Sequence, residues 1–255
     1  MIRLGVCTSP DRAAQAAAAG YDYIECALSP LATMSEEEFT AARDCVLASP
    51  IRAEAFNLMV PRAVPVVGPD VSQYCLRQYL DKTIPRAAAM GCRVIVFGSG
   101  HARKVPDGYC KQEAYDDIVA FLRTAGDRCA KFGITIAIEP LGAADCNILN
   151  SVAEAVWVTH RANHRAVKVL VDIYHAVRDN QSFHEIRAAG CLMAHTHVSH
   201  PVTRVFPLPG DGYDYWEFFR ALKDIGYTGR MSVEGNTEDF DSDLPKAFAL
   251  LRTLR

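Results

Sequence analysis

The sequence has none of the features that mark membrane, secreted or nucleic-acid-binding proteins. No apolar run approaches the roughly 20 residues that a membrane-spanning helix needs. Lys and Arg number 27 against 30 Asp and Glu, and the net charge of −3 leaves no basic surplus for holding a phosphate backbone. Residues 2–7 read as a strand, and they lack the basic start, apolar stretch and small-residue cleavage site of a signal peptide. We therefore expect a cytoplasmic protein that binds neither nucleic acid nor membranes.

The nine cysteines show no paired pattern. Their number is odd, their spacing is wide and no CxxC occurs, whereas a disulfide framework or a zinc knuckle needs cysteines at short, fixed spacing. Most of them fall in predicted strands or on predicted helix faces, so we expect reduced, small core residues. We also expect that no thiolate is positioned at a metal site.

Apolar, strand-like runs recur eight times, and each is followed by a helical pattern. Runs such as 94–97 and 134–138 are almost continuously apolar, which is typical of parallel strands that are buried on both faces. Segments such as 112–133 and 214–226 place apolar residues at the i, i+3, i+4 and i+7 positions of a helix. The predicted strands are 3–8, 21–28, 51–58, 93–99, 135–141, 167–175, 193–199 and 230–235.

Eight strand–helix units in 255 residues match the usual size of a (β/α)8 barrel. The alternative is a doubly wound open sheet, which normally has a glycine-rich phosphate loop after its first strand. Here that position, 7–10, reads CTSP, with neither GxGxxG nor a P-loop. No linker rich in proline, glycine or serine divides the chain. We predict one α/β domain over residues 1–255, a single (β/α)8 TIM barrel.

Acidic residues and a histidine occupy the ends of four neighbouring predicted strands. Glu139, Asp172 and Glu234 end the fifth, sixth and eighth strands, and His197 lies on the seventh. Barrel enzymes carry their chemistry at these C-terminal strand ends. Each residue alone is more often a helix cap, a salt-bridge partner or a core histidine, but three converging buried carboxylates need a cation. The four residues therefore predict a site for one divalent metal ion, with Mn²⁺, Co²⁺ or Mg²⁺ favoured and Zn²⁺ tolerated.

Further candidates follow other strands. Gly98 and Gly100 end the fourth strand and allow a backbone to approach a ligand closely. His101 and Arg103 follow them and have the chemistry to bind a hydroxyl, carboxylate or phosphate of a substrate, although a loop with solvated charges is an equal alternative. Three residues near other strand ends are weaker candidates for lining the pocket: Cys7, Glu25 and Asn57.

Together these motifs resemble those of the xylose isomerase-like barrel superfamily, and within it the sugar phosphate isomerase/epimerase group that includes the ketose 3-epimerases. The resemblance covers the whole chain in architecture and residues 139–235 in motifs. The motifs that carry it are Glu139-Pro140-Leu141 with Asp145, Asn147 and Asn150 downstream, Asp172-x-x-His175, His195-x-His197, Arg204, Pro209-Gly210-Asp211-Gly212, and Val233-Glu234-Gly235.

The resemblance implies roles for individual residues. The four strand-end residues would hold one divalent metal ion, and two of them, Glu139 and Glu234, would also transfer protons. His175, Arg204 and Asp145 would contact oxygens of a small sugar or sugar-like substrate. Members of this family are commonly homodimers or homotetramers, so the resemblance also implies one of these assemblies.

The implied reaction moves a proton on the carbon next to a carbonyl through a metal-stabilised enediolate. Two carboxylates on opposite faces of that intermediate allow epimerisation, whereas one base on a single face gives aldose–ketose isomerisation. Three alternatives remain: a lyase similar to inosose dehydratases, an AP-endonuclease-like hydrolase, and a non-catalytic sugar-binding module. The sequence departs from the epimerase pattern at Asp145, where a longer Glu is usual, and directly after His197. These departures concern the substrate more than the metal.

Overall fold

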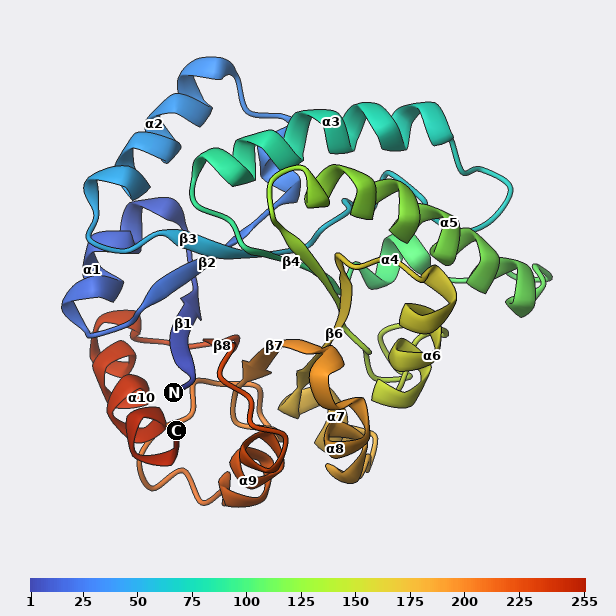
Figure 1. Ribbon diagram of the computed structural model, residues 1–255. Coiled ribbons are helices and arrows are strands. Elements are labelled where there is room, and N and C mark those ends of the chain that lie inside the picture. The colour runs from blue at the N-terminus through green and yellow to red at the C-terminus, as the bar shows by residue number, and fades with distance from the viewer.

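Eight parallel strands close into a barrel in the computed structural model, which describes residues 1–255 (Figure 1). Each strand pairs with the next along the chain, and the last returns to the first, where Leu4 lies opposite Met231. The strands are β1 (Arg3–Cys7), β2 (Tyr23–Ala27), β3 (Ala53–Asn57), β4 (Val94–Phe97), β5 (Thr135–Ile138), β6 (Val167–Asp172), β7 (Met193–Val198) and β8 (Arg230–Val233). The prediction of a TIM barrel is confirmed.

Helices surround the ring of strands on its outer side (Figure 1). None of them has an apolar stretch long enough to cross a bilayer. The α-helices are α1 (Ala13–Ala18), α2 (Glu36–Ala48), α3 (Gln73–Ala89), α4 (Gly100–Arg103), α5 (Lys111–Ala130), α6 (Val152–Ala162), α7 (Ile173–Arg178), α8 (His184–Ala189), α9 (Trp216–Asp224) and α10 (Phe240–Leu254). Three short 3-10 helices complete the chain: η1 (Pro10–Arg12), η2 (Ser29–Ala32) and η3 (Gly190–Leu192).

Two apolar regions hold the barrel together. The larger contains 67 buried residues and the smaller only 6, so most of the core lies between the strands and the surrounding helices. The smaller group includes Ala137 and Leu170, each two residues before a strand-end acid. Because alternate side chains of a strand point to the same face, these residues and the acids share the inner face of the barrel. Burial on both faces explains why the strands read as continuous apolar runs.

All eight predicted strands run past the observed C-terminal ends, and two of them do so by three residues. The predicted strand 167–175 ends at Asp172, because α7 begins at Ile173. The Asp172 side chain caps this helix by accepting a hydrogen bond from the backbone N–H of Tyr174 at 2.8 Å. His175 therefore lies on the first turn of α7 and not on a strand. The predicted strand 135–141 ends at Ile138, two residues before a proline that has no N–H to donate to a ladder.

Tyr23 fills part of the barrel interior because its neighbour on β1 is a glycine. Gly5 pairs with Tyr23 across the two strands, and a Cβ atom on Gly5 would lie 2.3 Å from the tyrosine ring. The buried Tyr23 hydroxyl lies 2.8 Å from Ser232 Oγ, so its polar group is satisfied. The absence of a side chain at position 5 is thus a packing requirement.

We predict that Gly5→Ala destabilises the protein by about 1–3 kcal/mol, because the added methyl group overlaps the Tyr23 ring. Urea denaturation gives the free energy of unfolding. The control is a double-mutant cycle in which Tyr23→Ala removes the ring, so that Gly5→Ala costs much less in this background. Equal costs in the two backgrounds would show that the overlap with Tyr23 is not the cause.

Candidate metal centre and pocket

The C-terminal ends of β5 to β8 bring four potential metal ligands to one place. Glu139 follows β5, Asp172 ends β6, His197 lies on β7 and Glu234 follows β8. One ligand atom of each residue lies within 4.8 Å of the corresponding atoms of the other three. The structure therefore brings together the four side chains that the sequence places at neighbouring strand ends.

His197 is the centre of this group. Its Nδ1 atom lies 3.0 Å from Glu139 Oε1 and 3.4 Å from Glu234 Oε2. On the other side of the ring, Nε2 lies 3.0 Å from Glu25 Oε1. Burial lowers the pKa of His197, but the negative charges of these three carboxylates outweigh burial and raise it well above its ordinary value. The local field thus strongly favours a positive charge at this point.

Asp172 has the least satisfied carboxylate of the group. Its Oδ1 atom accepts the hydrogen bond that caps α7, whereas its Oδ2 atom is buried without a hydrogen-bond partner. Burial and the negative charges of Glu234 and Glu139 raise the pKa of Asp172 to about 7. A buried acceptor without a donor is costly, and a cation in contact with Oδ2 would remove that cost.

The donor set fits one divalent cation. Two ligand atoms on opposite sides of Mg²⁺ lie about 4.2 Å apart, because each bond is about 2.1 Å long. The mutual distances of up to 4.8 Å between the four ligand atoms are compatible with this spacing. Carboxylate oxygens and one imidazole nitrogen are also donors that divalent ions of this class accept. The unpartnered Oδ2 of Asp172 supplies a free lone pair within the same group.

Glu234 is held from several sides. Asn57 Nδ2 donates to its Oε1 atom at 3.3 Å, and Arg204 Nη2 donates to its Oε2 atom at 2.9 Å. Burial raises the pKa of Glu234, but His197 and Arg204 outweigh burial and lower it to about 2. Arg204 has a φ of 55°, a strained conformation for a residue with a side chain, and its guanidinium stacks on Tyr174 at 4.8 Å. The strained backbone thus belongs to the residue whose side chain reaches Glu234.

Glu139 and Glu234 line a pocket of about 560 Å³, a volume typical of small-molecule sites. Its wall is formed largely by loops that follow β2, β3, β4 and β5, which all open at the same end of the barrel. Loop residues such as Ser29, Arg62 and His101 contribute polar groups to it. The lining suits a small polar ligand that reaches the candidate metal centre.

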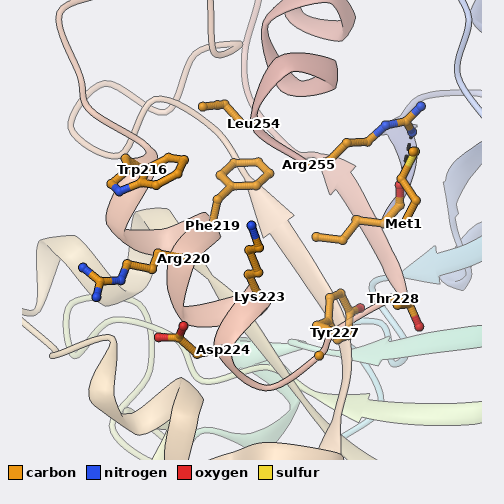
Figure 2. Close-up of a pocket in the computed structure, with 12 residues that line it drawn as sticks. Met1, Trp216, Phe219, Arg220, Lys223, Asp224, Tyr227, Thr228, Leu254 and Arg255 are labelled. Atoms are coloured by element: carbon orange, nitrogen blue, oxygen red, sulfur yellow. Dashed lines mark hydrogen bonds between the residues drawn. The ribbon is translucent and has the colours of Figure 1, made fainter.

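A second hollow lies at the opposite end of the barrel, beside the residues that precede β1 and β8. Figure 2 shows Trp216 and Phe219 of α9 on one side of it and Met1 on the other. It contains none of the candidate metal ligands. The pocket at the C-terminal strand ends is therefore the candidate site for chemistry.

His175 presents a hydrogen-bond donor to the candidate site. Its Nδ1 atom accepts a hydrogen bond from the Gly142 N–H at 3.2 Å. Burial, together with the charge of Arg204, lowers the pKa of His175 to about 4, so the ring is neutral at neutral pH and carries its proton on Nε2. That Nε2 atom has no hydrogen-bond partner and lies 3.7 Å from Asp172 Oδ2.

The other predicted substrate-binding residues have different outcomes. Arg204, Asp145 and His101 line the pocket, together with His175. Asp145 is already paired with the guanidinium of Arg178, so it forms part of a charged pocket wall. His101 is exposed at the start of α4.

The prediction that Arg103 contacts substrate is corrected by its position. Its side chain is fully buried and does not line the pocket. The guanidinium donates to the carbonyl oxygens of Phe97 at 2.7 Å and Glu139 at 2.8 Å, and it lies 3.4 Å from that of Leu149. Arg103 thus ties the ends of β4 and β5 together and supports the backbone of Glu139.

Cys7, one of the weaker candidates from the sequence, lies beside the candidate metal centre. The Cys7 sulfur belongs to a compact group with His197 and Glu234, within 4.8 Å of their ligand atoms. Burial and the nearby charges of Glu25 and Glu234 raise the pKa of Cys7 well above its ordinary value, so it borders the site as a neutral thiol.

The first half of the barrel contributes more residues to the site than the sequence patterns predict. Glu25 contacts the candidate ligand His197, and Asn57 contacts Glu234, although both were only weak candidates. Leu58 and Arg62, in the loop after β3, line the pocket and were missed. The available signal was their place directly after a predicted strand, since all such loops of a barrel meet at one end.

Comparison with known proteins identifies a matching family model and several relatives of this chain. A protein-family model described as a xylose isomerase-like TIM barrel matches residues 13–254. The L-ribulose 3-epimerase of Methylomonas sp. is 27% identical over 249 residues, which cover 94% of this chain and 83% of the relative. The D-psicose 3-epimerase of Agrobacterium fabrum is 38% identical over 104 residues, which cover 40% of this chain and 35% of the relative.

A solved structure supports the same architecture. A crystal structure of D-psicose 3-epimerase in the presence of D-fructose matches this chain with a TM-score of 0.88, over 99% of both chains. The two sequences are 21% identical, so the likeness establishes the shared fold.

We predict that Gly98→Ala weakens divalent-ion binding at least tenfold, about 1.4 kcal/mol, because an added Cβ atom would lie 2.0 Å from Glu139 Oε2 and displace that carboxylate. Titration calorimetry with Mn²⁺ measures the dissociation constant. The matched control is Gly100→Ala, whose Cβ atom would first meet the end of the flexible Leu141 side chain at 2.8 Å. Equal Mn²⁺ affinity in both variants would show that the space at position 98 is not needed by Glu139.

Proposed function

The chain belongs to the xylose isomerase-like TIM-barrel family, and from this membership we propose that it is a divalent-metal-dependent epimerase or isomerase of a small ketose or related hydroxy-keto compound. The observation that carries the proposal is the convergence of three carboxylates and one imidazole at the C-terminal end of the barrel. Two of these carboxylates line a pocket of suitable size. Relatives named as ketose 3-epimerases support the same class of reaction.

Glu139, Asp172, His197 and Glu234 would hold one ion, of which Mn²⁺, Co²⁺ or Mg²⁺ suits the donor set best and Zn²⁺ is tolerated. When bound, such an ion polarises a substrate carbonyl and makes the hydrogen on the neighbouring carbon more acidic. A further positive charge is present at the site, because Arg204 contacts Glu234 and lies 4.0 Å from Asp172.

Glu139 and Glu234 are the proposed proton-transfer pair. They follow β5 and β8, three strands apart in the ring, and both line the pocket. A carboxylate within hydrogen-bond reach removes the proton next to the substrate carbonyl. Return of a proton by the second carboxylate to the opposite face inverts that carbon, which is epimerisation. Return by the same carboxylate to the former carbonyl carbon, while the neighbouring hydroxyl proton passes to the former carbonyl oxygen, gives isomerisation instead.

Three further residues orient the substrate. His175 donates its Nε2 proton to a substrate oxygen beside Asp172, because that N–H has no protein acceptor. Arg204, which lies 4.0 Å from Asp172, and the Arg178-paired Asp145, which lies 3.5 Å from His175, contact hydroxyl groups of the substrate. A sugar-like substrate, with oxygens on every carbon, can satisfy all of these groups. The homodimer or homotetramer and the cytoplasmic location stay predictions.

We predict that Glu139→Gln and Glu234→Gln each lower turnover by about 10²- to 10⁴-fold while the fold is retained, because an amide cannot accept the substrate proton. The assay measures conversion of D-psicose, L-ribulose and related ketoses, together with incorporation of solvent deuterium next to the carbonyl. Circular dichroism verifies the fold.

The matched control is Glu113→Gln, on the exposed start of α5, which keeps wild-type turnover. Near-normal turnover in either site variant would refute the proton-transfer assignment. A dehydrated product would indicate a lyase in place of the proposed epimerase or isomerase. An ion-loaded protein that exchanges no deuterium on any of these sugars would indicate a different chemistry or a binding module.

We also predict that chelation abolishes activity and that added Mn²⁺, Co²⁺ or Mg²⁺ restores it, because three buried carboxylates at one point need a bound cation. Elemental analysis of the purified protein should find about one divalent ion per chain. A melting temperature that rises with metal concentration provides a measurement independent of substrate. Full activity of a verified metal-free protein would contradict the metal requirement.

A further inference from the structure

Glu25 is a fully buried carboxylate inside the barrel that the proposed reaction does not use. It lies on β2 and neither its backbone nor its side chain lines the pocket, so it does not touch substrate. Its Oε2 atom lies 2.8 Å from His195 Nε2, and its Oε1 atom lies 3.0 Å from His197 Nε2. One carboxylate therefore connects both histidines of the HxH sequence on β7.

These contacts determine which nitrogen of each ring carries the proton. An ionised carboxylate only accepts hydrogen bonds, so both imidazoles donate to Glu25 from Nε2. In the neutral His197 ring the lone pair is then on Nδ1. Nδ1 is the atom that lies 3.0 Å from Glu139 Oε1 and 3.4 Å from Glu234 Oε2, at the candidate metal centre.

A second set of buried contacts adjoins His195, on the side of Glu25 away from His197. Ser232 Oγ lies 3.4 Å from His195 Nε2 and 2.8 Å from the Tyr23 hydroxyl. Tyr23 and Glu25 are two residues apart on β2, so both point into the barrel, and none of these side chains is accessible to solvent. A continuous polar chain thus runs from Tyr23 through Ser232, His195 and Glu25 to His197.

We propose that Glu25 is a positioning residue of the metal centre: its hydrogen bond to Nε2 holds His197 in one tautomer and directs Nδ1 at the ion. The inference rests on the proposed role of His197 as a metal ligand. Glu25 is the only hydrogen-bond partner of His197 Nε2, so no other group in the structure can take over this function. A carboxylate in this position also makes the imidazole a stronger ligand.

The first test compares Mn²⁺ affinity in two variants. Glu25→Gln keeps the shape of the side chain and removes its charge, so the Mn²⁺ dissociation constant should rise about 10- to 100-fold in titration calorimetry. Ser232→Ala is the matched control, because it removes a buried contact of His195 and Tyr23 but leaves the Glu25–His197 contact in place. Its affinity should stay close to that of the wild type. Wild-type affinity in Glu25→Gln, or an equal loss in both variants, overturns the proposal.

The second test needs no variant, so it does not depend on whether an altered chain folds. In Mg²⁺-loaded wild-type protein with ¹⁵N-labelled histidine, nuclear magnetic resonance should show His197 protonated on Nε2. A proton on Nδ1 in the ion-loaded protein overturns the proposal.

His197→Ala separates this inference from the proposed function. If this variant binds Mn²⁺ as tightly as the wild type, the ligand set is wrong and both proposals fail. If His197→Ala loses affinity but Glu25→Gln does not, only the positioning role of Glu25 fails. Neither result depends on knowing the sugar substrate.

Discussion

The mutual repulsion of buried carboxylates at the end of the barrel is the constraint on which the site depends. Glu139, Asp172 and Glu234 meet where water is largely excluded, and one oxygen of Asp172 has no donor. The positive side chains that the protein pairs with these carboxylates are His197 and Arg204. Such an arrangement lowers the stability of the folded chain unless a cation compensates the charge. The cluster is therefore a candidate binding site for an ion and not a source of stability for the ion-free chain.

The barrel strands bring the acidic side chains together, and contacts with neighbouring residues then orient them. Alternate residues of each strand point inward, so one register places Ala137 and Glu139, or Leu170 and Asp172, on the same inner face. The apolar member of each pair packs the interior, and the polar member reaches the end of the barrel. Gly98 leaves room for the Glu139 carboxylate, while buried donors fix the backbone and side chains behind it. The candidate ligands thus all lie on or directly after the barrel strands.

The sequence predicted the barrel and the four converging residues because both depend on periodic, local patterns. Strand runs and the position directly after them are visible without tertiary information. Prediction from the sequence failed for side chains whose role depends on contacts with residues far away in the chain. Arg103 looked like a ligand-binding cation, yet its guanidinium turns inward to backbone carbonyls. Glu25 looked like a weak pocket candidate, and its two histidine partners lie about 170 residues away in the chain. The predicted β6 was longer than the observed strand. In an apolar run, the sequence does not show that Asp172 ends the strand and caps the helix that follows.

The two halves of the barrel serve different purposes at the site. The candidate ligand set comes entirely from the ends of β5 to β8, whereas Asn57 ends β3, and Leu58 and Arg62 approach from the loop that follows it. Leu58 has a φ of 48°, an unfavourable conformation for a bulky residue, and about half of its surface is exposed at the pocket. Strain of this kind persists only where surrounding contacts impose it, and here it places an apolar side chain in the pocket wall, which also contains Val60 and Leu141. Leu58 lies on a different loop from the candidate ligands, but the neighbouring Asn57 donates a hydrogen bond to Glu234 at 3.3 Å, so this wall is in direct contact with the ligand set. The strand ends therefore position the candidate ligands, and the loops that follow β2 to β5 supply most of the pocket wall around them.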